Sequence, residues 1–197
     1  MVDPQPRDAA DAELAAGLVA GQDWAIAETW HRFAPMVLAT AERSLGSRAE
    51  AEDVAQEVFS RVFRKAKTLR QPEALRSFVY SFAVRVLKSE LRRRRVRAFI
   101  PFLQSEPAEL GIRTVDVEAR DLLKRLYALM DRLTPRDRLV FVLRRMESMT
   151  VEEIAVTMGL SISTVKRAIN RASGRMTTWI ETDPGLSSLV REGNWGR

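Results

Sequence analysis

A run of arginines near the middle of the chain is the densest concentration of charged side chains in the sequence. Four consecutive arginines occupy positions 92–95, and further basic residues precede them. Guanidinium groups hydrogen-bond phosphate oxygens, and each phosphate that they neutralise releases counterions. Arginine near a helix C-terminus also favours the helix dipole, but four in a row exceed what that interaction needs. The run predicts salt-dependent nucleic-acid binding, with Arg76, Arg85, Lys88, Arg92 and Arg93 as phosphate ligands.

A second set of polar side chains lies on one face of a helix predicted after position 161. Thr150 and Glu153 have the spacing of a capping box, and Gly159 can adopt the positive φ that a tight helix exit requires. Two short helices joined in this way form a helix-turn-helix, although a plain helical hairpin with a solvated face has the same pattern. Hydroxyl, amide and basic groups suit phosphates and major-groove base edges. The candidate residues are Ser163, Thr164, Lys166, Arg167, Asn170 and Arg171.

A third set is acidic and lies on a helix predicted for residues 49–67. Apolar residues recur there at helical spacing and predict a buried stripe, whereas Asp53, Gln56 and Glu57 share the opposite face. From periodicity alone, an ordinary solvated face is the simplest interpretation. Short acidic side chains and an amide on a rigid helix can also pair with arginine and glutamine side chains of a partner helix.

Catalytic chemistry finds little support in the sequence. There is no cysteine, and His31 is the single histidine. No Walker loop, dinucleotide fingerprint or metal-spaced cluster is present. We therefore expect a protein that is not an enzyme and has no cofactor and no metal site.

The overall composition points to a charged, globular protein. The chain has 197 residues, of which 46% are hydrophobic, and 32 Lys and Arg against 26 Asp and Glu give a net charge of +6. This balance favours a polyanionic partner. No signal peptide or membrane-spanning segment is readable, which predicts a cytoplasmic protein without membrane insertion.

Helical periodicity dominates the chain and predicts an all-α fold. Pro35 should kink or split one of the long helices, because its ring removes a backbone donor. A stretch with no sustained period, rich in proline and apolar residues, separates two helical groups and predicts a flexible linker. The predicted helices cover residues 11–19, 24–45, 49–67, 73–95, 117–132, 135–146, 150–158 and 161–180, and the predicted parts are a domain at 1–97, a linker at 98–116, a domain at 117–180 and a tail at 181–197.

The acidic helix carries a family resemblance. Residues 51–59, AEDVAQEVF, resemble the polymerase-binding segment of sigma factors of the extracytoplasmic-function type, and residues 18–25 and 32–37 look like the opening of the same domain. In that family the helix docks on a coiled coil of the largest polymerase subunit. The resemblance thus assigns Asp53, Gln56 and Glu57 to core RNA polymerase.

Two other segments resemble the same family. Residues 75–83 resemble its promoter-melting segment, in which the preceding loop holds a flipped base, and residues 133–141 and 150–171 resemble its region-four domain. Phe78 stands where the family usually has Trp, and Arg85 replaces a usual Asn. We therefore expect Phe78 to belong more to the core than to a stacking platform.

The resemblance implies a transcription initiation factor with two helical domains, a region-two bundle and a region-four helix-turn-helix. Region two would bind core RNA polymerase and melt the minus-ten promoter element, while region four would read the minus-thirty-five element. An anti-sigma factor is a further partner known in the family. The alternatives are a stand-alone helix-turn-helix regulator, which leaves residues 52–59 unexplained, and a decoy that binds a regulator but has lost its DNA activity.

Overall fold

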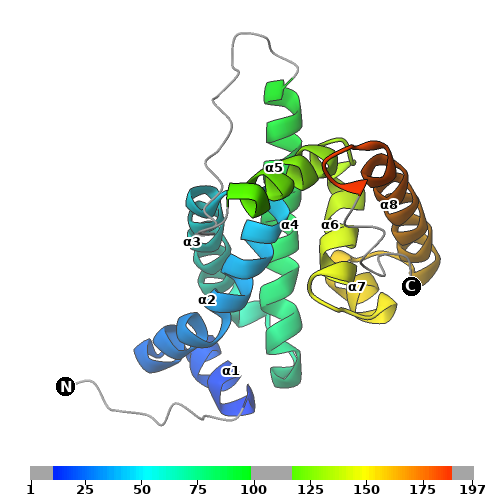
Figure 1. The fold of residues 1–197 in the computed structure, drawn as a ribbon. Coiled ribbons are helices and arrows are strands. Elements are labelled where there is room, and N and C mark those ends of the chain that lie inside the picture. The colour runs from blue at the N-terminus through cyan, green and yellow to red at the C-terminus, as the bar shows by residue number, and fades with distance from the viewer. Residues whose placement is uncertain (1–10, 99–116, 188–197) are drawn as a thin grey trace.

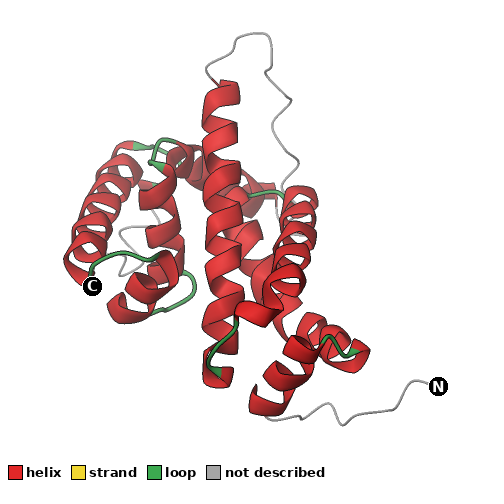
Figure 2. Cartoon of the chain, turned by 180° about the vertical axis from the view of Figure 1, so that it is seen from behind, coloured by secondary structure: helices red, strands yellow, loops and turns green. Residues whose placement is uncertain are grey.

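The computed structural model describes residues 11–98 and 117–187, and in these ranges the chain is helical without a strand. The all-α prediction is confirmed. The helices form two groups on either side of a long central helix (Figure 1, Figure 2). The N-terminal bundle contains α1 (Asp11–Ala20), α2 (Asp23–Leu45), α3 (Arg48–Lys65) and α4 (Leu75–Ala98), and the C-terminal bundle contains α5 (Val117–Asp131), α6 (Pro135–Arg145), α7 (Val151–Met158) and α8 (Ile162–Thr182).

Local capping interactions explain where several helices begin and end. The Thr150 hydroxyl accepts a hydrogen bond from the Glu153 N–H, and the Glu153 carboxylate accepts one from the Thr150 N–H, so the predicted capping box of α7 is present. Ser161 caps α8 in the same way through the Thr164 N–H. Gly159 ends α7 with a φ of 63°, as its place in the sequence predicted. Each such N-cap stabilises its helix by about 1 kcal/mol.

Pro35 does not split α2. The helix runs from Asp23 to Leu45 with Pro35 inside it, which agrees with the continuous helix predicted for 24–45, so of the two expected effects of proline the split does not occur. The ring lies on the exposed side of the helix, while its neighbours Phe33, Ala34 and Val37 are buried. Burial of this apolar face outweighs the single backbone hydrogen bond that proline removes.

The apolar stripe predicted for α3 and the apolar side chains of α4 form the core of the N-terminal bundle. Val58 and Phe59 of α3 are buried, as are Val79, Ala83 and Leu87 of α4. Helix α3 packs against α2 and α4, so its polar face is left to solvent. Two short 3-10 turns, Ala66–Thr68 and Pro72–Ala74, connect α3 to α4.

Helix α4 is buried on two sides, which periodicity did not predict. Tyr80, Val84 and Leu91 are buried in addition to Val79, Ala83 and Leu87. The helix contacts α2 and α3 on one side and α6 and α7 on the other. The C-terminal bundle therefore docks directly on α4, and the contact between the two bundles is called the seam below.

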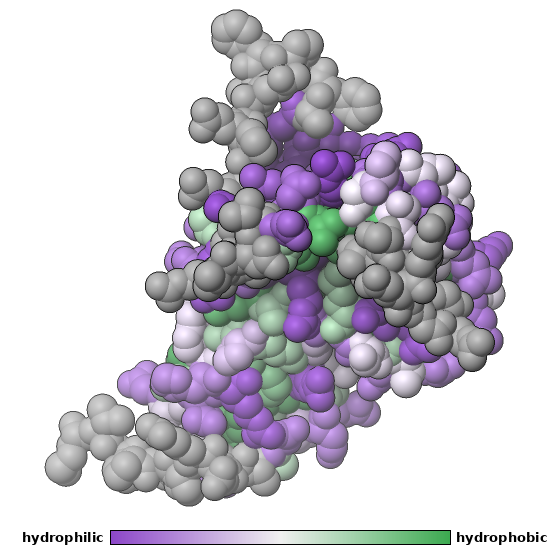
Figure 3. Space-filling view, viewed as in Figure 1, coloured by the Kyte–Doolittle hydropathy of each residue, from purple (hydrophilic) through white to green (hydrophobic). Residues whose placement is uncertain are grey.

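The apolar core continues across the seam. Leu139 of α6, Ile154 of α7 and Val165 of α8 belong to the same cluster of buried residues as the core of the N-terminal bundle. A second, smaller core lies within the C-terminal bundle, where Leu186 packs although it falls in the predicted tail. The apolar stretch at 99–103 and the end of the tail lie outside the described residues. On the face shown in Figure 3, hydrophobic side chains gather toward the middle and lower left, with hydrophilic ones around them.

Candidate nucleic-acid interface

The acidic face of α3 is open to solvent. Asp53 and Gln56 are exposed and Glu57 is half-buried. Arg61 Nε donates a 2.6 Å hydrogen bond to Glu57 Oε1, which holds the pKa of Glu57 below its usual value. Asp53 and Glu57 border a groove of about 510 Å³ between α3 and α4, whose other charged residues include Glu90 and Arg93. The three predicted polymerase ligands thus share one accessible surface of mixed charge.

The predicted phosphate ligands of α4 are divided between two surfaces. Arg85 is exposed and lies over the Phe82 ring, 5.4 Å from its centroid. Arg93 is exposed and forms a 3.4 Å ion pair with Glu90 beside the groove to α3. Lys88 and Arg92 instead point toward the C-terminal bundle, where they line a cavity at the seam. The basic run therefore does not form a single stripe.

The cavity at the seam gathers cations from three helices. It measures about 370 Å³ and is lined by Lys88, Arg92, Arg136, Arg171 and Arg175 together with one carboxylate, Asp137. Among the described residues, only Arg171 of these cations forms an ion pair, with Asp137 Oδ1 at 2.6 Å. Burial raises the pKa of Asp137, but hydrogen bonds from Arg171 and Thr134 outweigh it and lower the pKa. The cations of α4 and those of α6 and α8 thus line the same cavity, so positive charges face one another across the seam.

Arg76, at the start of α4, also lies at the seam. Hydrogen bonds to Thr150 lower the pKa of Glu153 in α7, and the positive charge of Arg76 contributes to that shift. The Arg76 guanidinium lies 5.9 Å from the centroid of the Tyr80 ring. The first turns of α4 and α7 are thus close in space.

The outward face of α8 is accessible in the part predicted to read DNA. Ser163, Lys166, Arg167 and Asn170 are exposed, while Thr164 is half-buried. On the inner side of the helix pair, Ile154 and Val165 are fully buried, and Leu160 and Ile169 are half-buried against the same core. Arg171 is held by Asp137 and so braces α8 on α6.

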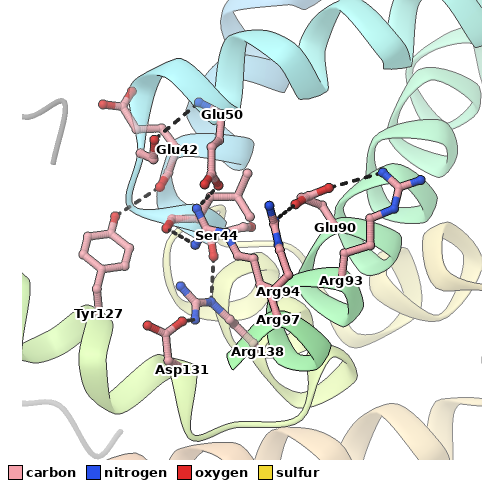
Figure 4. A network of polar contacts seen from close by, with 12 residues as sticks. Glu42, Ser44, Glu50, Glu90, Arg93, Arg94, Arg97, Tyr127, Asp131 and Arg138 are labelled. Carbon is pink, nitrogen blue, oxygen red and sulfur yellow. Dashed lines mark hydrogen bonds and ion pairs between the residues drawn. The ribbon is translucent and has the colours of Figure 1, made fainter. Parts of the chain in front are cut away.

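Sequence reasoning missed Arg138, which is the largest fully buried side chain. Its Nε donates a 2.6 Å hydrogen bond to the Ser44 carbonyl at the end of α2, and its Nη1 pairs with Asp131 (Figure 4). Only 2% of the side chain is exposed. The sequence shows an ordinary arginine in a charged segment there, with no sign that it is buried.

Arg94 was also missed, although it belongs to the basic run. Its Nη1 donates a 2.7 Å hydrogen bond to the Leu45 carbonyl, and its Nη2 pairs with Glu50. Burial and the charge of Arg138 lower the pKa of Arg94 to about 10. Figure 4 shows both arginines converging on the C-terminal end of α2. One arginine of the run is therefore a structural ligand rather than a free cation.

The described residues contain neither a helix that could span a membrane nor a group of side chains that could bind a metal ion. No helix in the described ranges combines the length and apolar character that crossing a membrane requires. Within the same ranges, no group of three His, Cys, Asp or Glu side chains could hold a metal ion.

Comparisons with known proteins show which family the chain belongs to. The Sigma-70 region 2 family matches residues 29–97, and the Sigma-70 region 4 family matches residues 123–176. The ferric citrate uptake sigma factor FecI of Escherichia coli is 32% identical over 134 residues, which are 66% of this chain and 76% of FecI. The chain belongs to the sigma factors. Within them it is of the extracytoplasmic-function type, as the sequence resemblance predicted.

Other relatives agree with this assignment. The extracytoplasmic-function sigma factor SigE of Mycolicibacterium smegmatis is 29% identical over 78% of this sigma factor and 60% of SigE. The structure of CnrH in complex with the cytosolic domain of CnrY matches with a TM-score of 0.65 and 24% identity, over 89% of this chain and 99% of CnrH. RpoE of Bartonella quintana, solved with the anti-sigma factor NepR, matches with a TM-score of 0.54 and 21% identity, over 76% of this chain and 92% of that one. The two structures show the same fold.

The family assignment excludes one of the two alternatives drawn from the sequence, the stand-alone regulator. The protein is a promoter-directing RNA polymerase sigma factor and not a stand-alone helix-turn-helix regulator. A stand-alone regulator would also leave the match to region 2 without an explanation.

Proposed function

We propose that this sigma factor binds core RNA polymerase through the acidic face of α3 and reads the two promoter elements with α4 and α8. The observation that carries the proposal is that separate exposed polar faces lie in the segments that match region 2 and region 4. In this scheme residues 1–97 are the region-two domain and residues 117–180 the region-four domain. Residues 98–116 join them, and residues 181–197 are a tail.

Helix α3 is suited to bind an arginine-bearing helix of the polymerase. Asp53, Gln56 and Glu57 lie within little more than one helical turn, so their positions are set by a rigid backbone. A glutamate is ionised at neutral pH, and the hydrogen bond from Arg61, which lowers the pKa of Glu57, keeps its carboxylate charged further into the acidic range. Charge-assisted hydrogen bonds to guanidinium groups are about twice as strong as neutral ones, which supports this face as the polymerase contact.

Helix α4 is suited to hold the opened downstream element. Flipping a base out of the DNA costs a few kcal/mol. Protein contacts to the flipped base and to the sugar-phosphate backbone of the DNA must offset this cost. Phe78 is half-buried and packs edge-on against Phe82, with 5.0 Å between the ring centroids, so it serves the core as expected. We assign the backbone contacts to Arg76, Arg85, Lys88, Arg92 and Arg93, and the base contacts to the connection between α3 and α4.

Helix α8 is suited to enter a major groove at the upstream element. Lys166, Arg167 and Asn170 project outward from a helix that Ser161 caps and that Val165 anchors in the core. Arginine can bind a guanine edge with two hydrogen bonds, and asparagine can bind adenine in the same way. Ser163 and Thr164, at the start of the helix, are placed for phosphate contacts.

We propose no catalytic role for the protein itself, since sigma factors lend specificity to the polymerase that carries the chemistry. It would act in the cytoplasm, where the polymerase is. The solved structure of CnrH contains the cytosolic domain of CnrY, and that of RpoE contains the anti-sigma factor NepR. We propose that this chain also has an anti-sigma partner.

Transcription in vitro tests the proposal directly. The purified protein is mixed with core polymerase and a library of genomic promoter fragments, and the transcripts are sequenced. We expect a set of start sites that depends on the added protein and shares an upstream and a downstream element. Transcripts that are unchanged by the protein, together with a pulldown in which it does not retain core polymerase, would refute the assignment.

A further inference from the structure

Four basic side chains gather around one cavity at the seam without forming an ion pair. The cavity of about 370 Å³ lies where α4, α6 and α8 meet, and α6 and α8 lie on the same side of α4 (Figure 1). Two of its cations come from the N-terminal bundle and two from the C-terminal bundle. Among the described residues, the cations of this cavity that form no ion pair are Lys88, Arg92, Arg136 and Arg175.

The single carboxylate of the cavity is neutralised by a fifth cation. Asp137 is 1% exposed, and Arg171 donates to it from Nε at 2.9 Å and from Nη2 at 2.6 Å. Bidentate pairs between arginine and a carboxylate are among the stronger polar contacts in proteins. The charges of Arg171 and Asp137 therefore cancel, and the cavity keeps an excess of four positive charges.

The uncompensated cations are accessible. Lys88 is half-buried, and Arg92, Arg136 and Arg175 are exposed. Water solvates the exposed guanidinium groups, so their mutual repulsion is screened while the free protein is in solution. An anion within the cavity would attract all four cations at once. The arrangement is thus suited to bind an anion with several negative charges.

The start of α6 adds a backbone donor to the same cavity. Thr134 and Pro135, the N-cap and the first residue of α6, belong to its lining. Proline has no N–H, and the N–H groups of Asp137 and Arg138 are bonded to Thr134. The Arg136 N–H has no partner among the described residues. A helix N-terminus with a free N–H and the positive end of the helix dipole favours phosphate groups.

The volume of the cavity suits a small ligand. Small-molecule sites measure about 300–1,000 Å³, and this cavity of about 370 Å³ lies at the low end of that range. A cavity of this volume is about 7 Å across, whereas the major groove of DNA alone is about 12 Å wide. A DNA duplex would therefore reach only the rim of the cavity.

The number of charges distinguishes a small polyphosphate from a DNA strand. A single DNA strand carries one charge for about every 3.4 Å, and so about two charges over a cavity about 7 Å across. A terminal phosphate carries a charge of about −1.5 to −2 at neutral pH, so two or three linked phosphates supply about three to four negative charges. That number matches the excess of four positive charges, whereas a DNA strand would leave about two cations without a partner.

The lining selects phosphate groups rather than a base. Among the described residues that line the cavity, none is aromatic. Aromatic rings are the surfaces on which proteins commonly stack the bases of nucleic acids. Because such a surface is lacking here, the linked phosphates are the part of a ligand that the cavity can recognise.

We propose that the cavity between α4, α6 and α8 binds a small anion of two or three linked phosphate groups. Lys88 and Arg92 bind it from the N-terminal bundle, and Arg136 and Arg175 bind it from the C-terminal bundle. The Arg136 N–H donates a further hydrogen bond at the start of α6. The site does not rest on the proposed function, since Arg136 and Arg175 are not among the residues assigned to DNA.

An anion shared by the two bundles stabilises the contact between them. A ligand that binds only the folded chain raises its stability with increasing ligand concentration. We expect a rise in Tm of about 5 °C or more when the anion is present at about 100 times its Kd. Differential scanning calorimetry measures this shift.

Calorimetric titration of the full chain tests the site. The anions are inorganic tripolyphosphate and pyrophosphate, with sulfate as an anion of a single group, all at one ionic strength and without divalent cations. We expect one site per chain that binds tripolyphosphate at least about 30-fold more tightly than sulfate, because the longer anion contacts more of the cations at once. Pyrophosphate should bind with an affinity between those of the other two.

A pair of substitutions outside the proposed DNA contacts locates the site. Arg136→Gln with Arg175→Gln removes two cations from the cavity and should weaken tripolyphosphate binding at least about 10-fold, because two charge-assisted hydrogen bonds are lost. The matched control, Arg64→Gln with Arg144→Gln, makes the same charge change at exposed positions outside the cavity. It should change the affinity by about 2-fold or less. Circular dichroism checks that both pairs remain helical.

Three results would overturn the proposal. Tripolyphosphate that binds no more tightly than sulfate would exclude a site for linked phosphates. Equal weakening by the two pairs would show that the net charge of the chain, rather than this cavity, attracts the anion. The third result concerns a labelled single-stranded oligonucleotide, whose binding is followed by fluorescence anisotropy. If the cavity pair weakens its binding but leaves tripolyphosphate binding unchanged, the cations serve the DNA backbone instead.

Discussion

The acidic face of α3 and the seam-facing stripe of α4 are neighbouring surfaces of one bundle, but only the first is open. Asp53 and Gln56 are exposed, whereas Tyr80 and Val84 are buried and Lys88 lines a cavity under the C-terminal bundle. The surface proposed to bind the polymerase is therefore accessible in this arrangement, while the apolar part of this stripe of α4 is covered.

The two buried sides of α4 share one apolar core. Toward α2 and α3, Val79, Ala83 and Leu87 are fully buried in a continuous apolar core. Toward the C-terminal bundle, Leu139, Leu143 and Ile154 belong to the same cluster of buried residues. Both sides of α4 therefore contribute to one apolar core, and both are bordered by cavities that charged residues line.

Charge reversal on α3 should have the largest effect. We expect Asp53→Lys with Glu57→Lys to weaken binding to core polymerase by at least about 100-fold, because like charges then meet in the interface. Fluorescence anisotropy with labelled protein measures the affinity. Glu13→Lys with Glu181→Lys makes the same charge change on exposed sites of α1 and α8 and should bind almost normally. Equal weakening by both pairs would show that net charge, not this face, determines binding.

Removal of the buried arginine at the seam should have the next largest effect. Arg138→Ala is expected to lower the free energy of unfolding by about 3 kcal/mol, because it leaves the Ser44 carbonyl buried without its donor and creates a cavity. Urea denaturation measures the change. The exposed Arg144→Ala should cost about 0.5 kcal/mol or less. A similar loss in both variants would contradict a special role for the seam.

Recognition by α8 should be sensitive to one exposed side chain. Arg167→Ala is expected to reduce discrimination at the upstream element by about 1–3 kcal/mol, which transcription from promoters with single-base changes can measure. Arg93→Ala is the comparison. Loss of a phosphate contact should weaken binding to all promoters alike, and it should lower by about one the slope with which the logarithm of affinity falls with the logarithm of salt concentration. An unchanged promoter preference in Arg167→Ala would contradict the assignment of α8 as the recognition helix.

The ion pair that braces α8 should make stability depend on pH. Asp137 is 1% exposed, and its pKa is lowered in the folded chain mainly by Arg171 and Thr134 against the opposing effect of burial. A carboxyl group whose pKa is lower in the folded than in the unfolded chain stabilises the fold at pH values above its unfolded pKa, about 4. This stabilisation is lost as the pH falls through the pKa of the folded chain. Asp137→Asn should thus lower the free energy of unfolding by about 1–2 kcal/mol at pH 7.

The difference between the chain and Asp137→Asn should shrink when urea titrations are repeated below pH 4. Asp121→Asn, which removes an exposed carboxylate paired with Arg125, is the control and should show a much smaller difference at every pH. A gap that stays constant from pH 7 to pH 3 would mean that the carboxylate charge of Asp137 does not stabilise the fold.

Loss of the capping box should have the smallest effect of the series. Thr150→Ala removes the acceptor for the Glu153 N–H at the start of α7 and should lower the free energy of unfolding by about 1 kcal/mol. Thr178→Ala, at an exposed site inside α8, is the comparison and should change it less. An equal loss in Thr178→Ala would contradict a stabilising role for the capping box.

Local chemistry in the sequence was enough to predict the helices and most of the candidate surfaces. Capping residues such as Thr150 and Ser161 and the glycine at 159 act within a few residues, so their effect can be deduced from the sequence around them. The same holds for the acidic face of α3, whose residues are arranged by helical periodicity alone. The roles of the site residues in binding stay predictions.

The seam was decided by the tertiary structure. Tyr80 and Val84 could be assigned to solvent or to a second contact, and Arg138 could be taken for a surface charge, because nothing nearby in the sequence satisfies or buries it. Its partner is the Ser44 carbonyl, 94 positions away. Backbone carbonyls exist at every residue, so no sequence pattern marks the one that a distant arginine will reach. Only the packing of α6 against the end of α2 selects it.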